Sequence, residues 1–176
     1  MLPRIVAEAA RRFGDRAAFR LPSGAPLSYR ALDTASDEVA AGLAARGLGE
    51  GDVLLLSLPS GPEYAVAYLA AAKVGAVTAG ANPRLRARER GLVADAVSPT
   101  LVLATEALTV GLPGDVAIEV VAPTGDPGRL LGPLRNVDHD VPDLVEDAGR
   151  PVCICFTSGS TGDPRGAWFT NRQLVA

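Results

Sequence analysis

The chain has 176 residues, 48% hydrophobic and 5% aromatic, which is enough for one domain with a core of its own. Its formal net charge is -3, and no basic patch indicates binding to nucleic acid. Charged residues interrupt the first segment, and the longest apolar run, residues 65–72, is too short to span a bilayer. These features argue against a secretory signal and a membrane span, and we expect a cytoplasmic protein.

Hydrophobic periodicity and turn residues predict a chain that alternates between helices and strands. In order, the sequence predicts a helix over residues 3–13, a hairpin of residues 17–21 and 26–28, a helix between Ser28 and Gly47, a strand over 53–58, a helix from Ser60 to Lys73 and a strand over 77–79. There follow a helix over 85–97, strands over 101–104 and 116–121, a loop over 123–150 with at most short helical turns, strands over 152–156 and 167–170, and a helix from Asn171.

Two helix starts carry capping signals. Ser28 can cap the helix that follows it. The sequence Ser60-Gly61-Pro62-Glu63 predicts a capping box, with Ser60 first and Glu63 three residues later.

Strands that are continuously apolar and alternate with helices indicate crossover connections. We therefore predict an α/β fold with a mainly parallel sheet and flanking helices.

The cysteines and the histidine offer little chemistry on their own. Cys153 and Cys155 lie two apart on a predicted strand, so they face the same side and are poorly placed to form a disulfide with each other. We expect them to be buried structural thiols. His139 is the only histidine, lies in a charged loop and is expected to be exposed to solvent. This set predicts no metal site.

The stretch from Thr157 to Gly166 carries the strongest chemical signal. It follows a predicted buried strand and combines four hydroxyls, three glycines and one fixed cation, Arg165. Glycines let backbone N–H groups converge on an anion, while hydroxyls and a guanidinium donate to phosphate oxygens. A solvated turn is the alternative for such a composition. The spacing does not match a Walker loop, which argues against an unrelated P-loop NTPase.

The order of these residues resembles the phosphate loop of the acyl-adenylate-forming superfamily, the AMP-binding acid–thiol ligases. The family pattern reads Tyr/Phe-Thr-Ser-Gly-Ser/Thr-Thr-Gly-x-Pro-Lys-Gly, a short strand, and then Thr-His-Arg. Residues 156–166 follow the pattern with Arg165 in place of Lys, and residues 170–172 follow it with Asn171 in place of His.

The resemblance extends to weaker motifs and covers nearly the whole chain from residue 3. These motifs are Leu27-Ser28-Tyr29, Gly51-Asp52-Val53, Leu58-Pro59-Ser60 and Asn82-Pro83-Arg84, of which the last is similar to acyl-CoA synthetases. The resemblance implies that residues 1–176 are the N-terminal portion of an AMP-binding domain, truncated shortly after the phosphate loop. The family's later segments, among them its magnesium-holding Thr-Glu and its lid domain with a catalytic Lys, have no counterpart here.

By resemblance, the chain belongs to proteins that use ATP and Mg²⁺ to convert a fatty or aromatic acid to an acyl-adenylate and then to an acyl-CoA. The expected ATP-binding residues are Thr157, Ser158, Gly159, Ser160, Thr161, Gly162 and Arg165. Asn171 matches a family position near the acyl pocket, and a helix N-cap is the alternative role. We expect the chain to be incomplete for catalysis. The alternative function is a non-catalytic ATP- or polyphosphate-binding module, a remnant or split subunit, which self-associates or pairs with a complementing polypeptide.

Overall fold

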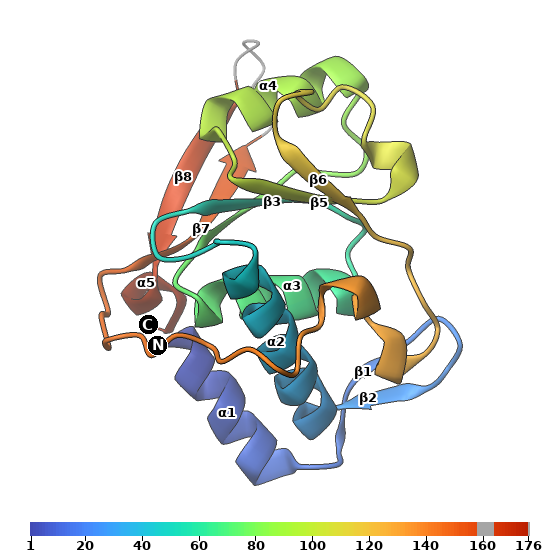
Figure 1. Ribbon diagram of the computed structural model, residues 1–176, viewed down its shortest axis with the longest axis vertical. Helices are drawn as coiled ribbons and strands as arrows, with labels where there is room; N and C mark the ends of the chain where they lie inside the picture. The colour runs from blue at the N-terminus through green and yellow to red at the C-terminus, as the bar shows by residue number, and fades with distance from the viewer. Residues whose placement is uncertain (158–163, 176) are drawn as a thin grey trace.

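The computed structural model describes residues 1–157 and 164–175 as three layers with a sheet in the middle (Figure 1). The helices are α1 (Leu2–Phe13), α2 (Tyr29–Ala45), α3 (Pro62–Lys73), α4 (Ala87–Val97) and α5 (Asn171–Val175), with short 3-10 turns η1 (Glu106–Leu108), η2 (Pro127–Arg129) and η3 (Gly132–Leu134). The strands are β1 (Ala17–Arg20), β2 (Pro26–Ser28), β3 (Val53–Ser57), β4 (Val77–Gly80), β5 (Leu101–Ala104), β6 (Ala117–Val120), β7 (Pro151–Thr157) and β8 (Arg165–Thr170).

The main sheet has six strands in the order β6-β5-β3-β4-β7-β8. Every neighbouring pair is parallel except β7 and β8, which are antiparallel, and β1 pairs with β2 in a separate hairpin. The prediction of an α/β fold with a mainly parallel sheet is confirmed. The observed strand and helix bounds stay within a few residues of the predicted ones.

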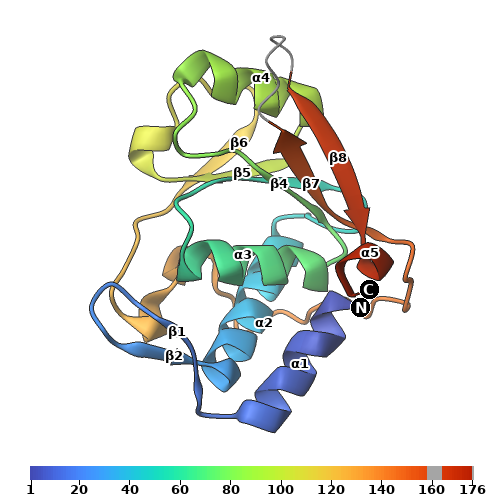
Figure 2. The same cartoon turned by 180° about the vertical axis from the view of Figure 1, so that it is seen from behind.

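The central strands β3, β4 and β5 are buried on both faces, which explains why they are continuous apolar runs. Leu54 and Leu56 face the core formed with α2 and α3, whereas Val53 and Leu55 face the core formed with α4. Figures 1 and 2 show α4 on one side of the sheet and α1, α2 and α3 on the other. Burying one such leucine side chain contributes about 1.5–3 kcal/mol, so these two small cores hold the layers together.

A buried ion pair joins α2 to α3. Lys73, the only lysine of the chain, is 8% exposed, and its ammonium lies 2.6 Å from the carboxylate of Asp33 and 2.5 Å from that of Asp37. It also donates to the backbone carbonyl of Asp33. These contacts compensate the charge, which is expensive to bury without partners.

The two predicted caps have different outcomes. The Ser28 hydroxyl accepts from the backbone N–H of Ala31 at 3.1 Å and caps α2, as predicted. The capping box at the start of α3 was wrong, because Gly61 is the N-cap residue and has no side chain to accept a hydrogen bond. Glu63 then lies one position too early to reach back. Its carboxylate accepts instead from the backbone N–H of Thr124, at 2.8 Å, and ties the loop after β6 to α3.

None of the helices that the structure describes combines the length and apolarity required to cross a membrane.

Candidate functional site

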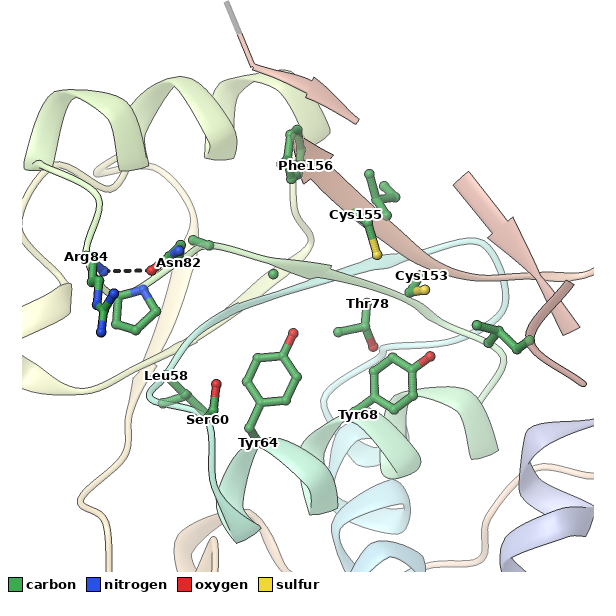
Figure 3. Close-up of a pocket in the computed structure, with 15 residues that line it drawn as sticks. Leu58, Ser60, Tyr64, Tyr68, Thr78, Asn82, Arg84, Cys153, Cys155 and Phe156 are labelled. Carbon is green, nitrogen blue, oxygen red and sulfur yellow. Dashed lines mark hydrogen bonds between the residues drawn. The ribbon is translucent and has the colours of Figure 1, made fainter. Parts of the chain in front are cut away.

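A cavity of about 760 Å³ opens at the carboxyl ends of β3, β4 and β7, on the side of the sheet that carries α3 (Figure 3). The chain leaves β3 through α3 on one face of the sheet and leaves β4 through α4 on the other, so the two loops diverge. Such a switch point is the usual ligand position in an open parallel sheet. The lining residues are Leu58, Ser60, Tyr64, Tyr68, Thr78, Gly80, Ala81, Asn82, Pro83, Arg84, Cys153, Ile154, Cys155, Phe156 and Leu174.

One wall of the cavity is aromatic. Tyr64 and Tyr68 lie one helical turn apart on α3, and both rings point toward the sheet (Figure 3). Burial is the main cause that raises the pKa of each phenol, and the neighbouring thiols raise both further. Both hydroxyls therefore stay neutral over a wide pH range. Neither tyrosine was predicted as a site residue, although two tyrosines at a spacing of four on a helix beside a strand end were an available signal.

The floor of the cavity comes from β4 and β7. Thr78 and Cys153 are direct neighbours in the parallel pairing, and Cys155 lies two residues further along β7. Gly80 is packed tightly, because a Cβ atom there would lie 2.7 Å from the Tyr64 hydroxyl.

The prediction for the two cysteines is half right. Cys153 is buried and Cys155 is exposed, so the expectation of two buried thiols was wrong for Cys155. Cys155 is exposed because the face of β7 beyond α3 opens into the cavity. As expected for an i, i+2 pair on a strand, both cysteines line the same cavity.

Arg84 marks the rim of the cavity. Its backbone N–H donates to the Asn82 side-chain oxygen at 2.9 Å, which forms a tight turn after β4. Among the described residues that line the cavity, Arg84 is the only charged one. The mouth therefore favours anionic or electron-rich ligands. The sequence Asn82-Pro83-Arg84 was recognised as a family-like motif but was not predicted to be part of a site.

The predicted phosphate loop begins at the same edge of the sheet. Thr157 is the last residue of β7, and it pairs across the hairpin with Arg165, the first residue of β8. Phe156 lines the cavity, so the loop starts beside it. The side chain of Arg165 is exposed. The other predicted phosphate-binding residues, Ser158, Gly159, Ser160, Thr161 and Gly162, lie outside the described residues, and their role stays a prediction.

Asn171 lies at the opposite end of β8 from Arg165, so the structure does not bring these two predicted site residues together. Its amide is buried, accepts from the backbone N–H of Leu2 at 2.9 Å and donates to the carbonyl of Asp147 at 3.3 Å. These bonds tie α5 to the start of α1. Asn171 is the first residue of α5, whereas an N-cap residue would immediately precede the helix. Its assignment to an acyl pocket stays a prediction.

Comparison with known proteins gives a consistent match. The family model described as AMP-binding enzyme matches residues 6–176. The chain is 34% identical over 157 residues to 4-coumarate–CoA ligase 5 of Oryza sativa subsp. japonica, covering 87% of this chain and 29% of that protein. It is 32% identical over 162 residues to 4-coumarate–CoA ligase CCL1 of Humulus lupulus, covering 87% and 30%. The chain thus spans about three tenths of the length of these relatives.

Solved structures match over almost the whole chain. The N-terminal subdomain of Klebsiella oxytoca NpsA superposes with a TM-score of 0.82 at 26% identity, covering 97% of this chain and 42% of that one. The same subdomain in complex with 3-hydroxybenzoyl-AMSN gives a TM-score of 0.77, covering 97% and 41%. The N-terminal domain of FACL13 from Mycobacterium tuberculosis gives 0.82 at 24% identity, covering 97% and 44%, and shows the shared fold alone.

Proposed function

The chain belongs to the AMP-binding enzyme family, and from this membership we propose that it is the N-terminal part of an acid–CoA ligase. The proposed reaction has two steps. A carboxylate attacks the α-phosphate of ATP, which gives an acyl-adenylate and pyrophosphate, and the thiol of CoA then displaces AMP. The agreement of residues 156–166 with the family's phosphate loop carries this proposal. The position of Thr157 at the carboxyl end of β7 supports it, because ligands of parallel sheets bind at that edge.

We propose an aromatic acid as the substrate, in preference to a fatty acid. The two relatives described above are named as 4-coumarate–CoA ligases, and the NpsA subdomain has been solved in complex with 3-hydroxybenzoyl-AMSN. The aromatic wall of Tyr64 and Tyr68 is compatible with a planar ring, since aromatic pairs favour offset or tilted contacts.

The loop's contribution to the chemistry is electrostatic. Hydroxyls and backbone N–H groups of residues 157–162 would hold the β- and γ-phosphates, with Mg²⁺ accompanying ATP as the family leads us to expect. Arg165 would neutralise charge on the departing pyrophosphate. Its planar guanidinium offers two parallel hydrogen bonds to one phosphate, whereas the family's lysine acts as a point charge.

Calorimetric titration of the chain with ATP, and separately with pyrophosphate, tests this proposal. We expect binding, and we expect Arg165→Ala to weaken it about tenfold, since a charge-assisted hydrogen bond contributes roughly 1.5–3 kcal/mol before ordering costs. The matched control is Arg16→Ala, an exposed arginine near the end of α1, which should leave binding unchanged. Absence of heat at millimolar ATP and pyrophosphate would show that the loop does not bind polyphosphate.

The second candidate function is a non-catalytic module that binds ATP or polyphosphate, which the hydroxyls, glycines and arginine of residues 157–166 support equally well. Residues 1–176 correspond to about three tenths of a 4-coumarate–CoA ligase. Such a module would bind nucleotide without turnover, and it would self-associate or pair with a second polypeptide that carries the later motifs. Both candidates predict polyphosphate binding, and only the first predicts turnover. The cytoplasmic location stays a prediction.

A further inference from the structure

The chain has only two cysteines, and the fold brings both into one cavity. Cys153 lies at its floor beside Tyr68, and Cys155 lies nearer the opening, where it is exposed. Figure 3 shows both side chains on the face of β7 that looks toward α3. A buried thiol and an accessible thiol thus share one wall, and a ligand that enters from solvent meets Cys155 first.

The spacing of the two thiols suits one bridging atom between them better than a direct bond. Residues i and i+2 of a strand are about 6.6 Å apart, and their Cβ atoms point the same way. A disulfide needs Cβ atoms about 3.5–4.5 Å apart, which this strand does not provide. Two sulfurs bound to one soft metal ion at about 2.3 Å each lie up to about 4.6 Å apart, and side-chain rotation closes the remaining difference.

A second feature of the cavity points to a missing ligand. The Thr78 hydroxyl is buried, with the residue only 1% exposed, and its oxygen has no hydrogen-bond partner among the residues that the structure describes. Thr78 is the direct neighbour of Cys153 across the β4–β7 pair, on the same face (Figure 3). A buried hydroxyl without a partner is costly. A thiolate on the neighbouring strand would accept a hydrogen bond from this hydroxyl more strongly than a neutral thiol does.

The donor set determines the class of ligand. The described residues that line the cavity include no histidine and no carboxylate, and the described chain has no group of three or more His, Cys, Asp or Glu placed to hold a metal ion. Structural zinc, which takes four ligands, and hard cations, which need several oxygens, do not fit two sulfurs. Soft ions that accept two thiolates do fit.

We propose that Cys153 and Cys155 form a two-thiolate site for one soft monovalent cation of the Cu(I) class. Both S–H protons pass to solvent, two sulfur–metal bonds form, and no electrons are transferred. The complex carries one net negative charge, and the only charged side chain among the described lining residues, Arg84, is a cation. Thr78 then donates to a thiolate from behind, as outer groups of metal sites commonly do.

Anaerobic titration of the reduced chain with Cu(I), in competition with the chromophoric chelator bicinchoninate, tests the site. We expect one Cu(I) per chain and two sulfur neighbours in the X-ray absorption spectrum of the copper. Cys153→Ser and Cys155→Ser should each lower the affinity at least about 100-fold, because a single sulfur remains. Cys155 is exposed, so its substitution leaves the core intact and keeps the test valid if Cys153→Ser folds poorly.

Thr78→Val tests whether the Thr78 hydroxyl supports Cu(I) binding or affects only the stability of the fold. This variant should weaken Cu(I) binding about tenfold. The same change should raise the melting temperature of the metal-free chain, because it removes an unpartnered buried hydroxyl. Thr105→Val, at the turn after β5, is the matched control and should leave the affinity unchanged. Retention of full affinity in Cys155→Ser, a stoichiometry other than one, or copper bound only to nitrogen and oxygen would overturn the proposal.

Discussion

At the residue scale, Tyr64, Tyr68 and Cys153 share an electrostatic property, since burial is the main cause that raises the pKa of each. The folded chain favours their neutral forms. The stability that this contributes is fully present below the ordinary pKa values, 9.0 for the thiol and 10.0 for the phenols, and is lost as the pH rises through the higher folded values. We therefore predict that the free energy of unfolding falls between about pH 8 and about pH 11.

Urea unfolding across this pH range measures the effect. The double variant with Tyr64→Phe and Tyr68→Phe should lose less stability than the unchanged chain, because two of the three groups no longer ionise. Tyr29→Phe, outside the cavity, is the matched control and should keep the full loss. An identical loss in the double variant would show that these phenols do not set the alkaline limit.

Some residues of the site could be predicted from the sequence, and others could not. Arg165 and the loop before it could be identified because their signal is the order of neighbouring residues. Thr78 and Cys153 could not be paired in advance, because their contact depends on β7 lying next to β4 rather than next to a strand closer in sequence. A parallel sheet creates its sites from such distant neighbours.

At the element scale, the contact between α2 and η3 depends on one glycine. A Cβ atom on Gly42 would lie 1.7 Å from the backbone carbonyl oxygen of Leu134, a position that cannot be occupied unless one element moves. Alanine has the higher helix propensity, by about 1 kcal/mol. Displacing packed backbone costs about 1–3 kcal/mol, so we expect Gly42→Ala to be destabilising on balance.

Chemical denaturation of Gly42→Ala measures this, with Gly114→Ala as the matched control. No atom lies within 4 Å of a Cβ atom at Gly114, so its substitution should be close to neutral. A more stable Gly42→Ala variant would mean that η3 moves away from α2 at little cost.

The elements themselves were largely predictable, and the exceptions have local causes. Continuous apolar runs indicated β3, β5 and β7, because the sheet is covered on both faces. The start of α3 was misread because Ser60 and Glu63 have the spacing of a capping box, while Gly61 and Pro62 begin the helix one residue later. The bond from Thr124 to Glu63 joins parts of the chain that no local pattern connects.

At the scale of the whole molecule, β8 is an edge strand with no partner on its outer side among the strands that the structure describes. Trp168 on this strand is 55% exposed, and Leu174 just after it is 40% exposed. An exposed apolar strand edge promotes pairing with another chain.

We predict that residues 1–176 self-associate at high micromolar concentration and that Trp168→Glu shifts the population toward monomer, as measured by sedimentation equilibrium. Val145→Glu, in a loop and 81% exposed, is the control and should have no effect. A monomer at all concentrations would count against this.

We predict that the polypeptide of residues 1–176 does not form acyl-adenylates on its own. Adenylation requires the α-phosphate and the carboxylate to be held in line, and such positioning contributes about 7–11 kcal/mol to lowering the barrier. Arg84 is the only charged side chain among the described residues that line the cavity, and Arg165 begins β8 at the same edge of the sheet. Two arginines can bind an anion but do not by themselves align two reactants.

We therefore expect no carboxylate-dependent exchange of labelled pyrophosphate into ATP by this polypeptide with a panel of aromatic and fatty acids. Exchange should appear when a second polypeptide that carries the family's later motifs is added, and Arg165→Ala should reduce it, while Arg16→Ala should not. Robust exchange by residues 1–176 alone would show that the first three tenths of such a ligase already position both reactants. Polyphosphate binding without exchange under either condition would favour the non-catalytic module, because the loop would then bind phosphate without any adenylation reaction.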